Sequence, residues 1–165
     1  MEIKAGQDRF VIVMPEIGIA VKIPIVHILL AMKMIRNDGW ECLRHSATAR
    51  HSPRYYLFKG IIANWSEFTF YQKTRNPFVQ VTYFSLMGMF NIVRVDDPCQ
   101  LDKKILRKQL YEITEGMISR DGHHFNNPDN FCFRDGKLKI LDYGSPATQQ
   151  IAMKYGKDIQ EKFRV

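Results

Sequence analysis

Residues His123 to Gly144 read HHFNNPDNFCFRDGKLKILDYG. Within this stretch, residues 131–141 (FCFRDGKLKIL) place two apolar runs on either side of a short polar turn. An Asp-Gly pair between two such runs is typical of a β-hairpin. The stretch therefore predicts a small hairpin, with Asn130 just before its first strand and Asp142 just after its second.

The rest of the chain divides into strands rich in β-branched and aromatic residues and helices with apolar residues at helical spacing. The predicted strands are Arg9–Met14, Ile19–Ile23, Phe78–Leu86, Met89–Val95, Phe131–Phe133 and Leu138–Leu141. The predicted helices are Ile25–Arg36, Tyr55–Thr74, Leu101–Arg120 and Gln149–Phe163. Strands and helices do not alternate regularly, so we expect an α+β fold with antiparallel strands.

Residues 40–54 are polar and are not assigned to an element. His45 and His51 in this segment would suit a phosphate contact, but a solvated loop is the favoured interpretation.

The composition is that of a folded domain. The chain has 165 residues, 45% of them hydrophobic, which indicates one domain or two small lobes and argues against disorder. The three cysteines (Cys42, Cys99 and Cys132) give neither a disulfide framework nor zinc-ligand spacing. No secretory signal is recognisable, and no apolar run reaches the roughly 20 residues of a membrane span. We therefore expect a cytoplasmic protein without a membrane partner.

The formal net charge is +7. A basic chain suits a nucleic-acid, phosphate or acidic partner, although a basic surface without a special partner is the simpler interpretation. No motif for RNA or DNA binding accompanies the charge, so a nucleic-acid partner is the least favoured of these.

Residues 123–130 (HHFNNPDN) follow a predicted long helix and precede the hairpin. In this position they resemble the catalytic loop of protein kinases, with His123, Pro128 and Asn130 at matching places. Asp142-Tyr143-Gly144, preceded by two apolar residues, resembles the D-F-G element that follows this loop in the same family.

The first half of the chain agrees with this resemblance. Ala20-Val21-Lys22-Ile23 is similar to the kinase V-A-I-K strand, whose lysine holds the α- and β-phosphates of ATP. Glu67, on the predicted helix Tyr55–Thr74, stands where kinases carry the glutamate that pairs with that lysine. The resemblance covers roughly residues 9–146, with its parts in family order.

The resemblance implies a protein-kinase-like fold of two lobes. Residues 1–97 would form an N-lobe with an antiparallel sheet, and residues 98–165 a much reduced helical C-lobe. It also implies ATP and Mg²⁺ as cofactors, with the phosphates held by Lys22 and Glu67. Asn130 and Asp142, which the hairpin brings together, would ligate the metal through hard oxygen atoms.

The chain departs from the family at the catalytic base. Phe125 stands where kinases have the aspartate that accepts the proton of the attacking hydroxyl. Asp121, His123 and His124 are nearby, and His124 is the candidate substitute because an imidazole titrates near neutral pH. The favoured interpretation is nevertheless that His123 packs and bonds to the backbone, that His124 is solvated, and that Asp121-Gly122 forms the turn ending the long helix.

Two further family features are missing. Residues 1–18 contain only Gly6 and Gly18, in no glycine-rich phosphate-binding arrangement, and only 21 residues follow Gly144.

Two functions fit this combination of present and missing features. The first is a minimal phosphotransferase in which Asp142 and Asn130, with His124 as a weaker candidate, act on an unidentified protein or small-molecule acceptor. The alternative is a pseudokinase-like regulatory or binding protein. The short C-terminal part would also allow a dimer that covers exposed apolar surface.

Overall fold

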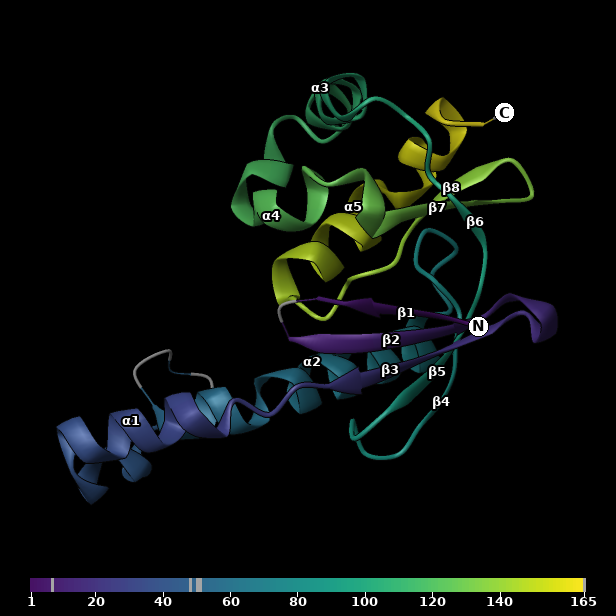
Figure 1. Cartoon of the computed structure of the whole chain (residues 1–165). Helices are drawn as coiled ribbons and strands as arrows, with labels where there is room; N and C mark the ends of the chain where they lie inside the picture. Colours follow the sequence, from purple (N-terminus) through teal and green to yellow (C-terminus); the bar gives the residue numbers. More distant parts are fainter. Residues whose placement is uncertain (7, 48, 50–51, 165) are drawn as a thin grey trace.

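A computed structural model describes residues 1–6, 8–47, 49 and 52–164. The architecture is α+β with antiparallel sheets, as predicted (Figure 1). The strands are β1 (Glu2–Ala5), β2 (Arg9–Met14), β3 (Ile19–Pro24), β4 (Thr82–Ser85), β5 (Asn91–Arg94), β6 (Asp97–Pro98), β7 (Phe131–Arg134) and β8 (Lys137–Ile140). The α-helices are α1 (Ile28–Asp38), α2 (Pro53–Thr74), α3 (Lys103–Ile113), α4 (Gly122–Phe125) and α5 (Pro146–Lys162).

The larger sheet has five strands in the order β1-β2-β3-β5-β4, and all neighbouring strands are antiparallel. Lys22 lies in the central strand β3, opposite Val11 of β2 and Asn91 of β5. The sequence pattern did not predict the edge strand β1. Its four residues are all exposed, so they carry no alternation of buried and exposed positions, and they are ordered by pairing with β2.

Helix α2 is held against this sheet by a buried asparagine. The Nδ2 atom of Asn64 donates hydrogen bonds to the backbone oxygens of Lys22 (3.2 Å) and Gly88 (3.1 Å). Gly88 has φ of +82°, and a Cβ atom on it would lie 2.2 Å from the backbone oxygen of Ile61, so only glycine allows this approach. These contacts position Glu67, three residues after Asn64 on α2, above the central strand.

The smaller sheet contains three strands in the order β6-β7-β8 and joins α3, α4 and α5 in the second half of the chain (Figure 1). The segment Phe78–Gln80 was predicted to begin a strand of the larger sheet, but β4 begins only at Thr82. Its backbone instead bonds to Ile140 of β8, with N···O distances of 2.8 Å at Phe78 and 2.9 Å at Gln80. This segment therefore connects the two sheets.

The main core lies between the smaller sheet and the helices around it. Its buried members are Phe78, Val79, Leu106, Leu110, Ile118, Phe125, Phe131, Leu138, Ile140, Tyr143, Ile151, Ala152, Tyr155, Ile159 and Phe163. Side chains from just before β4 and from just after β8 belong to this one cluster. The core therefore fixes the backbone on both sides of Asp142.

The long helix predicted over Leu101–Arg120 is wrong in its second half. Helix α3 ends at Ile113, because Glu115 and Gly116 adopt left-handed conformations with φ of 52° and 79°. A 3₁₀-helix over Met117–Asp121 follows, and α4 comes after it. The apolar spacing continues through the break, whereas a glycine at a helix end is the signal that marks it.

The other helices were predicted with errors at their ends. Helix α2 begins at Pro53, capped by Ser52, and α5 begins at Pro146, capped by Ser145. Both starts combine a serine cap with a proline in the first turn. Part of the unassigned segment 40–54 forms a 3₁₀-helix over Trp40–Arg44, whereas His51 lies outside the described residues.

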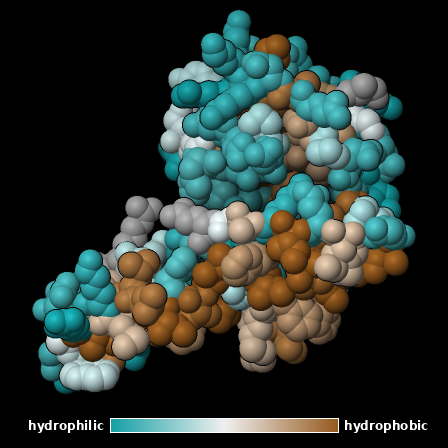
Figure 2. All heavy atoms as spheres, in the orientation of Figure 1, coloured by the Kyte–Doolittle hydropathy of each residue, from teal (hydrophilic) through white to brown (hydrophobic). Residues whose placement is uncertain are grey.

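Exposed apolar side chains gather on one part of the surface. Figure 2 shows them over the lower half of the view, where Figure 1 places α1, α2 and the β4–β5 hairpin. The larger ones here include Leu29, Met32, Phe58, Ile62, Trp65 and Met87. This apolar surface lies on the first part of the chain. The sequence led us to expect a partner-covered surface on the C-terminal part. Among the described residues, no helix is long and apolar enough to cross a membrane.

Candidate functional site

The predicted pair of Lys22 and Glu67 is formed. The Nζ atom of Lys22 lies 3.0 Å from Oε2 of Glu67 and 2.6 Å from the backbone oxygen of Leu141. Lys22 is 5% exposed and Glu67 is fully buried. Burial lowers the pKa of Lys22 and outweighs the opposing effect of Glu67. The pair joins β3 to α2. The bond of Lys22 to Leu141 also ties it to the residue that precedes Asp142.

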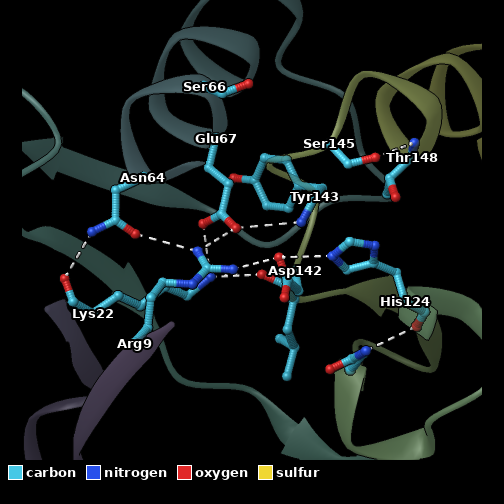
Figure 3. A network of polar contacts seen from close by, with 12 residues as sticks. Arg9, Lys22, Asn64, Ser66, Glu67, His124, Asp142, Tyr143, Ser145 and Thr148 are labelled. Carbon is cyan, nitrogen blue, oxygen red and sulfur yellow. Dashed lines mark hydrogen bonds and ion pairs between the residues drawn. The ribbon is translucent and has the colours of Figure 1, made fainter. Parts of the chain in front are cut away.

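Asp142 lies beside this pair, but an arginine that the sequence did not single out stands between them (Figure 3). Arg9, the first residue of β2, donates from Nη1 to Oε1 of Glu67 (2.6 Å) and from Nη2 to Oδ1 of Asp142. Its Nη1 atom is also 3.2 Å from Oδ1 of Asn64. Arg9 thus connects the carboxylate of α2 to the carboxylate that follows β8.

His124 approaches Asp142 from the other side (Figure 3). Its Nε2 atom lies 3.5 Å from Oδ1 of Asp142, and its Nδ1 atom donates to Oδ1 of Asp121 at 2.7 Å. The interpretation of His124 as solvated is wrong, because it is 8% exposed, whereas its neighbour His123 has an exposed side chain. The prediction that His123 packs is therefore also wrong.

Asp121 is a buried anchor rather than a simple turn residue. Its Oδ2 atom accepts hydrogen bonds from the hydroxyls of Ser145 and Thr148, the latter at 2.5 Å, at the start of α5. Burial would raise the pKa of Asp121, but the hydrogen bonds from His124, Ser145 and Thr148 lower it to about 2. Asp121 therefore holds both His124 and the N-terminus of α5 in place.

The charges around the site balance. Burial opposes ionisation of Asp142, but Arg9 and His124 outweigh it and hold the pKa of that carboxyl far below its usual range. Burial likewise disfavours a charged His124, but the hydrogen bonds to Asp121 and Asp142 raise its pKa to about 9. At neutral pH His124 is therefore an imidazolium. In this state it holds a proton and does not accept one.

The raised pKa of His124 predicts a pH-dependent stability. A group whose pKa is higher in the folded state stabilises fully below its ordinary value, 6.5, and the contribution is lost as pH rises through about 9. We expect the free energy of unfolding to fall by about 3 kcal/mol over this interval. Urea denaturation at a series of pH values measures it.

The neighbouring histidine supplies the comparison for this prediction. His123→Gln should retain the fall in stability, because the side chain of His123 is 77% exposed. His124→Gln should remove most of it. An identical fall in the wild type and in His124→Gln would show that another group is responsible.

Asn130 is held next to Asp142 by the hairpin, as predicted. The backbone N–H of Leu141 donates to the backbone oxygen of Asn130 at 2.8 Å. The Nδ2 atom of Asn130 donates to the backbone oxygens of His124 (2.9 Å) and His123 (3.4 Å). Among the described residues, nothing donates a hydrogen bond to Oδ1 of Asn130 or to Oδ2 of Asp142.

Phe125 is fully buried and points into the core. Its ring centroid lies 6.1 Å from that of Phe131 on β7. The position that the resemblance aligns with the catalytic aspartate therefore offers an apolar ring to the core and no polar group to the site.

Tyr143 is locked in place after Asp142. Its hydroxyl lies 2.8 Å from the backbone oxygen of Gln80 and 2.8 Å from the hydroxyl of Thr82. Its backbone N–H lies 3.4 Å from Oε1 of Glu67. Because the ring is buried and both the hydroxyl and the backbone N–H are bonded, the backbone after Asp142 has little freedom to move.

Asp121, His123 and His124 bring ligand-type atoms within 4.8 Å of one another. The oxygens of Asp121 are already bonded to His124, Ser145 and Thr148, and Nδ1 of His124 is occupied by Asp121. The hydrogen bonds of this trio therefore serve the local structure, and a metal would have to break them.

A hollow of about 650 Å³ lies between the β2–β3 turn and the chain around β6. Its lining includes Pro15, Gly18, Val95, Asp97 and Arg134. None of the predicted site residues lines it. Arg9 and His124 both contact Asp142, and Arg9 also contacts the carboxylate that binds Lys22.

The structure thus assembles Lys22, Glu67, Asp142, Asn130 and His124, and adds Arg9 and Asp121. Arg9 is the first residue of a predicted strand, where an arginine carries no signal of an inward side chain.

Comparison with known proteins adds no relative: no protein-family model matches the chain, and neither the curated proteins nor the solved structures contain a significant match.

Proposed function

We propose that this chain is a kinase-like protein that binds Mg²⁺ and ATP and acts as a minimal phosphotransferase. The observation that supports the proposal most is the buried ion pair of Lys22 and Glu67, 45 residues apart, beside Asp142. A buried lysine is costly unless it is paired. Its retention at a site where carboxylates converge fits a role in binding phosphates.

The residues present also fit a magnesium ion. Mg²⁺ prefers hard oxygen ligands and is usually held by one or two protein groups plus substrate phosphates. Asp142 and Asn130 would hold it, since each has one side-chain oxygen without a hydrogen bond from the described residues. When bound, the ion would neutralise charge on the phosphates.

The protein's own groups would contribute mainly positioning. Lys22, fixed by Glu67, would bind phosphate oxygens, and Tyr143 would keep the backbone of Asp142 rigid. Phosphoryl transfer through a loose transition state depends more on orientation and electrostatics than on a base. Phosphoryl transfer can therefore proceed, more slowly, with Phe125 in place of an aspartate.

A second function is favoured by a specific observation. Phe125 is buried in the core and His124 is held protonated, so no group in the aligned position is ready to accept a proton from an acceptor hydroxyl. A pseudokinase-like regulatory protein, which binds nucleotide without transferring phosphate, would have this arrangement.

Transfer from labelled ATP separates the two functions. The purified protein is incubated with Mg²⁺ and γ-labelled ATP, alone and with candidate protein and small-molecule acceptors, and both labelled product and ADP are measured. Product or ADP that depends on Mg²⁺ and is lost on chelation supports the phosphotransferase. Nucleotide binding is measured in parallel by calorimetric titration with a non-hydrolysable ATP analogue and Mg²⁺. Binding without either product supports the regulatory protein, and the lack of binding contradicts both functions.

A further inference from the structure

Arg9 occupies the centre of the proposed site without having been assigned a role. Its guanidinium contacts Glu67 through Nη1 and Asp142 through Nη2, and its side chain is 11% exposed. Lys22 binds the other oxygen of Glu67, so two cations share one carboxylate. In the free protein Asp142 supplies the second negative charge beside this cation pair.

Gly6 and Asp8, which flank the connection between β1 and β2, hold the start of β2 and Arg9 in place. The N–H of Gly6 donates to the backbone oxygen of Arg9 at 2.8 Å, which closes the turn. The carboxylate of Asp8 lies 2.7 Å from Nζ of Lys59 on α2. A Cβ atom on Gly60 would lie 2.8 Å from the backbone oxygen of Asp8, so α2 and the turn are in close contact.

The sequence before β2 has no glycine-rich arrangement whose backbone donors could surround a phosphate. The guanidinium of Arg9, at the start of β2, extends into the site (Figure 3). A guanidinium offers five donors in a planar fork that matches phosphate oxygens.

A metal ion on the unbonded Oδ2 of Asp142 would weaken the contact of Arg9 with Oδ1, because two cations on one carboxylate repel each other. The contact of Nη1 with Glu67 is independent of Asp142, and it would keep the guanidinium in place while Nη2 is released. The released donor would then need an anion close to the metal.

We propose that Arg9 is a phosphate-binding residue, which passes from Asp142 to the nucleotide phosphates when Mg²⁺ and nucleotide bind. This inference rests on the proposed nucleotide site and adds a ligand to it. Arg9 would supply from a side chain the donors that a glycine-rich turn supplies from the backbone.

Calorimetric titrations with two ligands test the inference. Wild type, Arg9→Lys and Arg9→Gln are titrated with a non-hydrolysable ATP analogue in Mg²⁺ and, separately, with AMP. We expect Arg9→Gln to weaken binding of the ATP analogue by about 10- to 100-fold, because a charge-assisted contact is lost. Arg9→Lys should be intermediate, and AMP should change by less than about 2-fold. Arg44→Gln, which removes the same charge from an exposed site, should match the wild type.

The contrary outcomes are distinct. Equal weakening of AMP and the ATP analogue would make Arg9 a structural residue and overturn the inference, as would unchanged or tighter binding of the analogue in both Arg9 variants. If Arg9→Gln does not fold, Arg9→Lys decides by the same ratio of affinities. If wild type and the Arg9 variants bind the analogue equally, the role of Arg9 is contradicted and the proposed function stands. If wild type binds neither ligand, the role of Arg9 and the proposed function are both contradicted.

Discussion

Glu67→Ala is expected to lower the free energy of unfolding by about 3–5 kcal/mol, because it leaves buried charges unpaired. Glu67 is fully buried and binds Lys22 at 3.0 Å and Arg9 at 2.6 Å. Without it, Lys22 keeps the hydrogen bond to the backbone oxygen of Leu141, and Arg9 keeps Asp142 and Asn64. Urea denaturation at pH 7 measures the loss.

Two companion variants make this result interpretable. Glu67→Gln retains an oxygen that can accept a hydrogen bond and should lose less stability than Glu67→Ala. Glu41→Ala breaks an exposed ion pair with Arg44 and should change stability by less than about 1 kcal/mol. A loss below about 1 kcal/mol for Glu67→Ala would mean that Lys22 and Arg9 are solvated in solution and that the site is not assembled as described.

Asp142→Ala is expected to have the largest effect on nucleotide chemistry. The residue would hold the metal, and in the free protein it binds Arg9 and is approached by His124. Removing a group that stabilises charge at a reacting centre costs roughly 10²- to 10³-fold in rate. We therefore expect Mg²⁺-dependent formation of ADP or phosphorylated product to fall by about that factor, measured with γ-labelled ATP.

The hairpin itself offers a matched comparison for Asp142. Asp135→Asn removes a carboxylate from the β7–β8 turn, where the side chain is 80% exposed and pairs with the neighbouring Arg134. That variant should retain the wild-type rate. Asp142→Asn preserves the shape and should still lose most of the activity, because an amide carries no charge. Equal activity of Asp142→Ala and wild type would place the chemistry elsewhere.

Local signals in the sequence were enough to predict β3, α2 and the β7–β8 hairpin as elements, whereas the pairing of Lys22 with Glu67 was implied by the resemblance to kinases. A β-branched strand containing one lysine and an Asp-Gly turn between apolar runs specify their structures within a few residues. Helix α2 was predicted to end at Thr74, where it ends, because the Asn-Pro step that follows disfavours helix. These elements position Lys22, Glu67, Asn130 and Asp142.

The contacts that the sequence did not predict depend on tertiary structure. Arg9 reads as the first residue of an ordinary strand, and only the position of α2 brings Glu67 to it. His124 reads as polar and solvated, yet Asp121 and Asp142 enclose it, because α3 ends early and α4 turns the chain back. Phe78 is a residue type that favours strands, but its backbone bonds to Ile140 and so connects the two sheets.

These contacts change how the proposed site is understood. The sequence alone suggests a lysine, a glutamate and two metal ligands waiting for a nucleotide. In the structure, three cations (Lys22, Arg9 and His124) balance three carboxylates (Glu67, Asp121 and Asp142). A nucleotide bound at the proposed site would therefore have to exchange contacts within a paired network. Its binding would depend strongly on Mg²⁺, which would take over the charge of Asp142 from Arg9.

A structure determined with a non-hydrolysable ATP analogue and Mg²⁺ tests whether this site binds nucleotide as proposed. We expect the metal to bind oxygens of Asp142 and Asn130, Lys22 to contact phosphate, and the pair of Lys22 with Glu67 to remain. A nucleotide bound away from Lys22, or a metal that Asp142 does not ligate, would contradict this expectation.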